Sequence, residues 1–299
     1  MADTHQFDAR KLFGVEDFVA VVTGGGTGIG LMAAQALSAN GAKVYITGRR
    51  KEVLEDSAKS HQPAPGVSKG QIIPIGPCDV TSKDDLEKLV AEIGKREKCI
   101  NLLVCNAGIA GPKAEPKASD ADDLKAQLWD NEDPAGWSEN FNTNVTAVYF
   151  TTVAFLPLLQ AGIRPKGKLE PFSTSVITIS SMSGIMSRHA QGHFSYNTAK
   201  GATVQLTKLM SAEFQKAQIR VNSIAPGYFP SEMTAKESDE NQKSYVPPET
   251  IQDKGHVPLM RAGREEEMGM TVLYLAKNQY VNGEIIAVDG GVLNVLGGR

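Results

Sequence analysis

The stretch TGGGTGIG at residues 23–30 decides the fold, because it follows the apolar run VAVVT at 19–23 and opens a helical pattern. Gly24, Gly28 and Gly30 allow the backbone to turn sharply, to approach a pyrophosphate and to pack a helix against a strand. The first turn of that helix adds N–H donors and a positive dipole. The loop therefore predicts a dinucleotide site; a plain turn between strand and helix is the alternative.

Short apolar runs alternate with stretches of helical periodicity along the rest of the chain. The expected strands are VAVVT at 19–23, KVYIT at 43–47, QIIPI at 71–75, INLLVCN at 100–106, VITIS at 176–180 and IRVNSIA at 219–225. The expected helices cover 31–40, 84–97, 137–160, 196–216 and 265–277. Nearly continuous apolar strands that alternate with helices predict an α/β fold, a Rossmann-type doubly wound parallel sheet of about seven strands with helices on both faces. We expect a single domain over 1–299 with its core at about 15–292.

Two regions do not follow this pattern. Residues 110–136 are rich in Ala, Lys, Asp and Pro and predict an exposed excursion with one helical turn near 124–128. Residues 231–258 are polar and contain Pro247 and Pro248, which is typical of a mobile flap. We expect the residues that select a substrate to lie in these two regions.

Composition excludes several classes of function. The 299 residues carry a formal net charge of −3, with the basic residues dispersed, so nucleic acid is not expected as a partner. The polar N-terminus lacks the apolar stretch of a secretory signal, and the longest apolar segment, 146–159, contains Pro157 and is too short to span a bilayer. Three cysteines fit neither a disulfide framework nor a metal site. We expect a cytoplasmic protein without a membrane segment.

The second expected strand ends at Thr47, Gly48, Arg49 and Arg50. A site that selects NAD places a carboxylate about 20 residues past the glycine loop, where it binds the ribose 2′-hydroxyl. Here that place holds Gly48, and the guanidinium of Arg49 can pair with a 2′-phosphate. This favours NADP(H); the alternative is that both arginines are solvated loop charges.

A tyrosine and a lysine lie one helical turn apart in Tyr196-Asn-Thr-Ala-Lys200, and therefore share a face. A free phenol has a pKa of about 10, and a neighbouring ammonium, helped by an oxidised nicotinamide, would lower it toward working pH. The run Ser180–Gly184 ends the preceding strand, and Ser181 is the first choice for orienting a substrate oxygen, with Ser183 the second. By itself the pair is a weak pattern, but its position strengthens it.

The glycine loop, Asn106-Ala107-Gly108, Asn144, Ser181 and the Tyr196/Lys200 pair follow in an order that resembles the short-chain dehydrogenase/reductase family over about 15–292. Pro226-Gly227 and VDGG at 288–291 add to the resemblance, which implies a catalytic tetrad of Asn144, Ser181, Tyr196 and Lys200. In that family the matching asparagine holds a water that relays protons through the lysine. The cofactor-binding residues implied are Thr23, Gly24, Gly28, Ile29, Gly30, Arg49, Asp79, Val80, Asn106, Ala107, Gly108, Tyr196, Lys200, Pro226, Gly227, Phe229 and Ser231.

Two departures from the family pattern stand out. Ser181 and Tyr196 are 15 residues apart, slightly more than usual, and Ser231 stands where members commonly carry Thr. The longer loop, with Met186, Arg188, His189 and His193, is expected to reshape the substrate pocket. His189 and His193 lack a third ligand with suitable spacing, so no metal is expected.

The leading hypothesis is an NADP(H)-dependent oxidoreductase that reduces a ketone, with Tyr196 as proton donor to a small-molecule carbonyl. The alternatives are a non-catalytic NADP-binding regulator and a 3-oxoacyl-thioester reductase, whose carrier-protein partner would want a basic patch from residues such as Arg188, Arg261 and Arg264. An epimerase on an extended relative of the fold would need a larger C-terminal domain. The apolar helices 137–160 and 196–216 and the tail VLNVLGG predict, by resemblance, a homotetramer or a homodimer.

Overall fold

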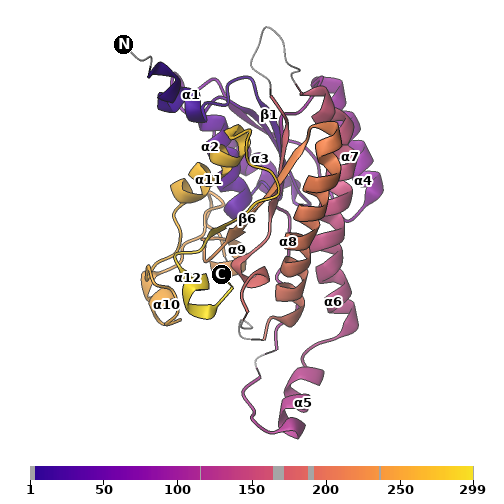
Figure 1. Cartoon of the computed structure of the whole chain (residues 1–299), viewed down its shortest axis with the longest axis vertical. Helices are drawn as coiled ribbons and strands as arrows, with labels where there is room; N and C mark the ends of the chain where they lie inside the picture. The colour runs from indigo at the N-terminus through magenta and orange to yellow at the C-terminus, as the bar shows by residue number, and fades with distance from the viewer. Residues whose placement is uncertain (1–3, 115, 164–171, 188–191, 236, 299) are drawn as a thin grey trace.

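A computed structural model describes residues 4–114, 116–163, 172–187, 192–235 and 237–298. Seven parallel strands form one sheet in the order β3-β2-β1-β4-β5-β6-β7, with helices on both faces (Figure 1). The strands are β1 Val19–Thr23, β2 Lys43–Thr47, β3 Gln71–Pro74, β4 Leu102–Cys105, β5 Ser175–Ile179, β6 Arg220–Pro226 and β7 Ile285–Val288. All six strands placed from the sequence are confirmed, as is the doubly wound single-domain fold.

The helices divide between the two faces of the sheet. They are α1 Ala9–Phe13, α2 Gly28–Ala39, α3 Lys51–Ser60, α4 Lys83–Arg96, α5 Ala121–Trp129, α6 Pro134–Phe141, α7 Ala147–Ala161, α8 Phe194–Phe214, α9 Glu232–Ala235, α10 Pro248–Gln252, α11 Glu265–Lys277 and α12 Val292–Leu296. Short 3-10 turns cover His5–Phe7, Met182–Gly184 and Gln215–Ala217. In β1, Ala20 and Val22 pack with α2 and α11, whereas Val19 and Val21 pack with α4, α7 and α8. Two separate cores result, one on each face.

The helix expected over 137–160 is not a single regular helix. A π-helical turn, Asn142–Thr146, separates α6 from α7. The helical stretch Pro134–Ala161 is long and apolar enough, by length and composition alone, to cross a membrane. The core helix of a soluble protein can share both properties, and α7 packs here against β4, β5 and α4.

The two irregular regions contain more structure than the sequence indicated. The excursion 110–136 carries α5, which has no buried residue and projects from the body beyond the end of α6 (Figure 1). The flap 231–258 carries α9 and α10 and buries Val246, Ile251 and Val257 in a small third core with α12. Apolar residues at wide intervals thus fasten a segment that is polar on average.

Candidate active site

The glycine loop leads from β1 into α2 with its backbone exposed to a cavity. Gly24 and Gly28 have φ values of +62° and +50°, which favour glycine. A Cβ on Gly30 would lie 2.2 Å from the carbonyl oxygen of Gly24, so no side chain fits there. The N-cap residue Thr27 makes no side-chain hydrogen bond to the first turn of α2. The N–H groups of that turn therefore remain available to an anion such as a pyrophosphate.

Asn106 holds the glycine loop from beneath. Its Nδ2 donates to the carbonyl oxygens of Thr23 and Gly24, both at 3.0 Å. The backbone N–H groups of Asn106 and Ala107 in turn donate to the Thr23 hydroxyl at 3.0 and 3.1 Å. Thr23 is buried and acts as a support for the loop, so it does not face the cavity.

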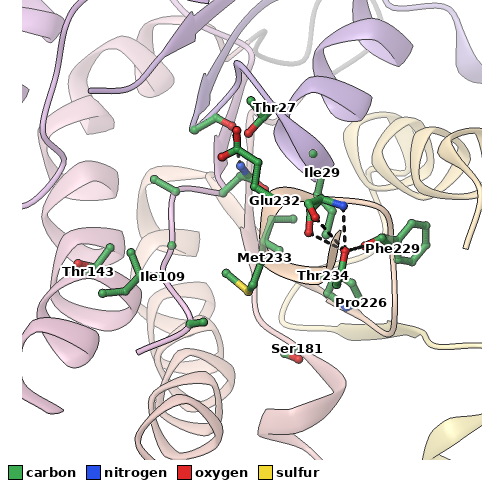
Figure 2. A pocket seen from close by; sticks show the side chains of 18 of the residues that line it. Thr27, Ile29, Ile109, Thr143, Ser181, Pro226, Phe229, Glu232, Met233 and Thr234 are labelled. Carbon is green, nitrogen blue, oxygen red and sulfur yellow. Dashed lines mark hydrogen bonds between the residues drawn. The ribbon is translucent and has the colours of Figure 1, made fainter. Parts of the chain in front are cut away.

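A cavity of about 850 Å³ lies at the carboxyl ends of the strands, where open α/β sheets bind ligands. Figure 2 shows part of its lining, from Thr27 on the glycine loop to Ser181 at the end of β5. Thr23 and Gly30 do not line it. The other predicted cofactor-binding residues do: Gly24, Gly28, Ile29, Arg49, Asp79, Val80, Asn106, Ala107, Gly108, Tyr196, Lys200, Pro226, Gly227, Phe229 and Ser231. A cavity of this volume, with the anion-binding start of a helix in its wall, fits a dinucleotide.

One end of the cleft carries Arg49 and Asp79. Hydrogen bonds from the N–H and hydroxyl of Thr81, at 2.9 and 2.7 Å, lower the pKa of Asp79, and the charge of Arg49 lowers it further. Asp79 is therefore a carboxylate that accepts hydrogen bonds. Arg49 is exposed and makes no ion pair with any described residue.

The other end brings together Tyr196, Lys200 and Ser181. The Lys200 Nζ is buried and donates to the carbonyl oxygen of Ile179 at 2.8 Å, and burial lowers the pKa of this lysine to about 8. It lies 5.7 Å from the centroid of the Tyr196 ring. Burial raises the pKa of Tyr196, and a hydrogen bond with the Ser181 side chain opposes that rise. The lowering expected from the sequence includes the charge of a bound oxidised nicotinamide, and it stays a prediction for the cofactor complex.

The hydroxyl groups of the serines after β5 face different parts of the structure. The Ser180 hydroxyl donates to the Ile224 carbonyl oxygen at 3.1 Å and accepts from Ser223, so it is engaged with β6. The Ser181 Oγ accepts from the Ser183 N–H at 3.1 Å and faces the phenol of Tyr196. Ser183 also lines the cavity.

Asn144 lies in the π-helical turn, where it is fully buried and does not line the cavity. Its side-chain amide binds both the N–H and the carbonyl oxygen of Ile109, at 3.1 and 2.9 Å. Its own carbonyl oxygen accepts from the Thr203 hydroxyl at 2.7 Å. A Cβ on Gly108 would lie 2.7 Å from Asn144 Oδ1 and 3.5 Å from Lys200 Nζ. Asn144 therefore stands directly behind the cavity wall next to Lys200, and a π turn at this point is typical of a functional site.

A polar group that links Tyr228 to the flap was missed by sequence reasoning. The Tyr228 hydroxyl lies 2.9 Å from His256 Nε2, and His256 Nδ1 lies 2.7 Å from the Lys254 carbonyl oxygen. The Lys254 ammonium lies 4.8 Å from the centroid of the Tyr228 ring. Tyr228 and Lys254 line the cavity. The only signal was the position of Tyr228, directly after Pro226-Gly227.

Other expected residues are not assembled into a site. Arg188 and His189 lie outside the described residues, whereas His193 lines the cavity. Arg261 forms an ion pair with Glu267 at 2.6 Å, and the Arg264 N–H donates to the same carboxylate at 2.7 Å. The Arg261 guanidinium is therefore engaged, whereas Arg264 contacts Glu267 through its backbone N–H and its residue is exposed. Within the described ranges, no group of three His, Cys, Asp or Glu side chains is placed to hold a metal.

Comparison with known proteins identifies the family. A family model described as enoyl-(acyl carrier protein) reductase matches residues 24–293. The short-chain dehydrogenase/reductase PhomF of Diaporthe leptostromiformis is 42% identical over 292 residues, covering 96% of this chain and 95% of the relative. The rhamnolipids biosynthesis 3-oxoacyl-[acyl-carrier-protein] reductase of Pseudomonas aeruginosa is 31% identical, covering 93% of this chain and 97% of the relative.

Solved structures agree with these relatives. The Pseudomonas aeruginosa RhlG/NADP active-site complex superposes with a TM-score of 0.74 at 30% identity, covering 94% of this chain and 98% of that chain. The chain described here carries the family's nicotinamide-binding fold, and its cavity lies at the carboxyl ends of the strands. It belongs to the short-chain dehydrogenase/reductase family and is an oxidoreductase of alcohol and keto groups.

Proposed function

We propose that this protein reduces a small-molecule ketone with NADPH, with Tyr196 as the proton donor. The observation that carries the proposal is the meeting of Tyr196, Ser181 and Lys200 at one end of a cleft whose other end holds Arg49. A dinucleotide that lies along the cleft would have its nicotinamide near the phenol and its adenosine near the guanidinium.

The preference for NADP(H) is supported by the end of β2. No carboxylate stands at Gly48 to bind a ribose 2′-hydroxyl, and the exposed Arg49 beside it has a fork of donors that matches a phosphate. One relative of known structure is named as an NADP complex. In this proposal, the first turn of α2 holds the pyrophosphate and Asp79 accepts from the adenine.

The catalytic roles follow from burial and charge. When bound, the nicotinamide supplies or accepts a hydride. Ser181 donates to the substrate oxygen and orients it, while Tyr196 transfers its proton to that oxygen. A phenol has an ordinary pKa of about 10 and is therefore protonated at neutral pH, so Tyr196 can begin the reduction as the proton donor. The hydrogen bond with Ser181 opposes the rise in its pKa that burial causes. The Lys200 ammonium, close to the ring, stabilises the phenolate that remains. Asn144 is the fourth member of the proposed tetrad. Its side chain lies behind the cavity wall and holds the backbone of Ile109, next to Gly108 and Lys200.

A 3-oxoacyl thioester is a second candidate substrate, because two relatives with about a third identity are named as 3-oxoacyl-[acyl-carrier-protein] reductases. Against a carrier protein as partner, the Arg261 guanidinium is already paired with Glu267. Acetoacetyl-coenzyme A in the substrate panel separates this candidate from free ketones.

We also propose a cytoplasmic homotetramer or homodimer. Cys78, Cys99 and Cys105 are all free, as a reducing compartment would keep them. Tyr149 on α7 and Leu209 on α8 are exposed, at 41% and 58%, and would be covered if these helices paired with a second copy. A monomeric mass measured by light scattering would refute this assignment.

The test of the proposed function measures cofactor and substrate separately. Calorimetry should give tighter binding of NADPH than of NADH, and the exchange Arg49→Gln should remove most of that preference, whereas Arg10→Gln on α1 should not. NADPH absorbance should then fall with at least one member of a ketone panel. If the protein binds NADPH but consumes none with any substrate of the panel, the non-catalytic regulator becomes the better assignment.

A further inference from the structure

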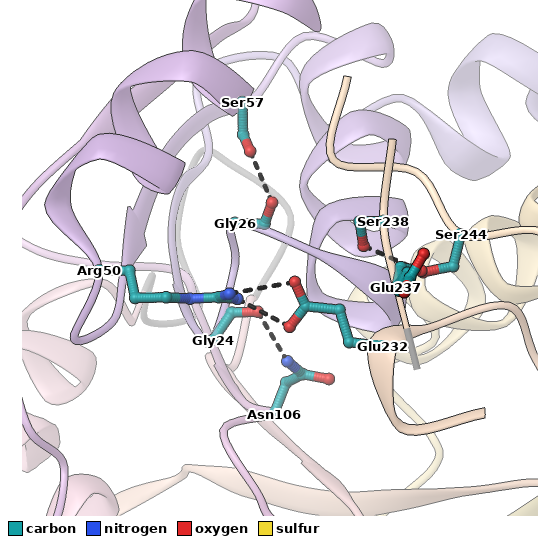
Figure 3. Close-up of polar contacts among 9 residues, drawn as sticks. All are labelled: Gly24, Gly26, Arg50, Ser57, Asn106, Glu232, Glu237, Ser238 and Ser244. Atoms are coloured by element: carbon teal, nitrogen blue, oxygen red, sulfur yellow. Dashed lines mark hydrogen bonds and ion pairs between the residues drawn. The ribbon is translucent and has the colours of Figure 1, made fainter. Parts of the chain in front are cut away.

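Arg50 and Glu232 form an ion pair across the cofactor cleft. Arg50 immediately precedes α3, and Glu232 is the first residue of α9 on the flap. The two guanidinium nitrogens of Arg50 donate to the two carboxylate oxygens of Glu232 at 3.1 and 2.8 Å. Both residues line the large cavity. In the view of Figure 3 the pair lies in front of Gly24, whose carbonyl oxygen accepts from Asn106.

The two neighbouring arginines differ in their partners. Arg50 has a two-point contact with a carboxylate, whereas Arg49 makes no ion pair within the described chain. A guanidinium fork binds a phosphate in the same two-point manner as it binds a carboxylate. The Glu232 carboxylate therefore holds the donors of Arg50 that a 2′-phosphate would take.

We propose that Glu232 is a specificity-determining residue, which competes with the 2′-phosphate of the cofactor for Arg50. This inference rests on the proposed preference for NADP(H). A 2′-phosphate carries more negative charge than one carboxylate and displaces it, so NADP(H) opens the pair. NAD(H) has no group that replaces Glu232, and the pair stays closed across the cleft.

Displacement of Glu232 also acts on the flap. The neighbouring Ser231 lies against the glycine loop, where a Cβ on Gly28 would be 2.9 Å from the Ser231 Cβ. Farther along the flap, Asn241 and Lys243 remain tied to the body, through His61 at 2.7 Å and Glu265 at 2.6 Å. Release should therefore be local to α9, which begins beside the glycine loop.

The test isolates the 2′-phosphate. Adenosine 2′,5′-bisphosphate and adenosine 5′-monophosphate differ only in that group, and calorimetry gives the affinity of each. Arg50 and Glu232 are 55% and 33% exposed, and exposed pairs are weak. Glu232→Gln should therefore tighten the bisphosphate about threefold and leave the monophosphate unchanged. The gain should shrink in high salt.

Control variants distinguish the effect of breaking the Arg50–Glu232 pair from the effect of removing any negative charge. Glu240→Gln removes one exposed negative charge from the same flap and should leave both affinities near those of the unmodified protein. Arg50→Gln in the Glu232→Gln background should abolish the gain. Thermal unfolding of each variant checks that it is folded. Amide exchange at 231–235 should rise when the bisphosphate binds the unmodified protein and should not rise with the monophosphate.

Each contrary result has a distinct meaning. Weaker binding of both nucleotides to Glu232→Gln would show that Glu232 clasps the cofactor, and equal binding to both proteins would show no competition; each overturns the inference. Neither of these two results contradicts the proposed function, provided that the unmodified protein binds the bisphosphate more tightly than the monophosphate. If that preference is missing and Arg49→Gln has no effect, the proposed cofactor preference fails, and the inference fails with it.

Discussion

The glycine-loop side of the cleft and the flap side are built in different ways. On the first, backbone lies against backbone, as where a Cβ on Gly30 would strike the Gly24 carbonyl at 2.2 Å. On the second, the helices α9 and α10 have four and five residues and are fastened by a few apolar side chains and ion pairs. Close backbone packing on the glycine-loop side allows only certain residue types. The looser packing on the flap side tolerates many. Residue changes on the flap side are therefore expected to disturb the fold less than changes on the glycine-loop side.

The largest effect is expected from a methyl group on the glycine-loop side. Gly30→Ala should destabilise the protein by about 3 kcal/mol and abolish binding of NADPH, because the Cβ meets a backbone atom that cannot rotate away. Gly94→Ala in α4, where the Cβ meets nothing within 4 Å, is the matched control, and should stabilise by roughly 0.5 kcal/mol. Urea unfolding and calorimetry give both quantities. Normal binding by Gly30→Ala would break the contrast between the two sides.

At the catalytic end, Lys200→Met should lower kcat at least about a hundredfold and yet raise stability. The folded-state pKa of Lys200, about 8, lies below its usual 10.5. Below pH 8 Lys200 is protonated in both the folded and the unfolded state, so the folded state bears the full cost of burying its charge. Between pH 8 and 10.5 only the unfolded state keeps the proton, so the unmodified protein gains stability as the pH rises.

The shift corresponds to about 3 kcal/mol, and loss of the hydrogen bond to Ile179 offsets about 1 kcal/mol of it. Urea unfolding of Lys200→Met at pH 7 should therefore show a gain of about 2 kcal/mol, which shrinks toward pH 10. Lys208→Met on the same helix is the control, because it removes a lysine that is exposed. A loss of stability at pH 7 would contradict the assigned cost of burial.

On the flap side, Tyr228→Phe should raise KM for the substrate several-fold, with little change in kcat. The exchange removes the hydroxyl that meets His256 at 2.9 Å but keeps the ring that lines the cavity. It should cost about 1 kcal/mol of stability. Tyr280→Phe, at a fully exposed tyrosine, is the control. A fall in kcat as large as that of Lys200→Met would place Tyr228 in the proton transfer and not in substrate selection.

The smallest effect is expected on the excursion. Trp129 at the end of α5 is 76% exposed, and Trp129→Ser should change the free energy of unfolding by less than about 0.5 kcal/mol. Thermal and urea unfolding at low protein concentration measure it. A larger loss would mean that α5 is packed in solution, against a second copy or the body.

The contrast between the two sides also explains what the sequence could predict. The glycine loop, six strands and the Tyr196 helix are local patterns whose residue types the backbone requires. The helix α3 was missed because KEVLEDSAKS has few apolar residues, and only Leu54, Ser57 and Ala58 are buried. The strand β7 was not located because its residues are only partly buried at the sheet edge.

Long-range pairings lay beyond sequence reasoning. Arg50 and Glu232 are 182 positions apart, and nothing near either residue indicates the other. The π turn at Asn144 was equally hidden, because its residues continue the helical pattern on both sides. The burial that raises the pKa of Tyr196 was also not visible in the sequence, since desolvation depends on the packing around the ring.

The central claim, that Tyr196 donates the proton in an NADPH-dependent reduction, is tested most directly by Tyr196→Phe. NADPH binding by calorimetry and NADPH oxidation with an accepted ketone should be measured on the same preparation. The variant should bind NADPH within about twofold of the unmodified protein and oxidise it at least about a thousandfold more slowly. Retention of normal turnover with normal binding would contradict the account.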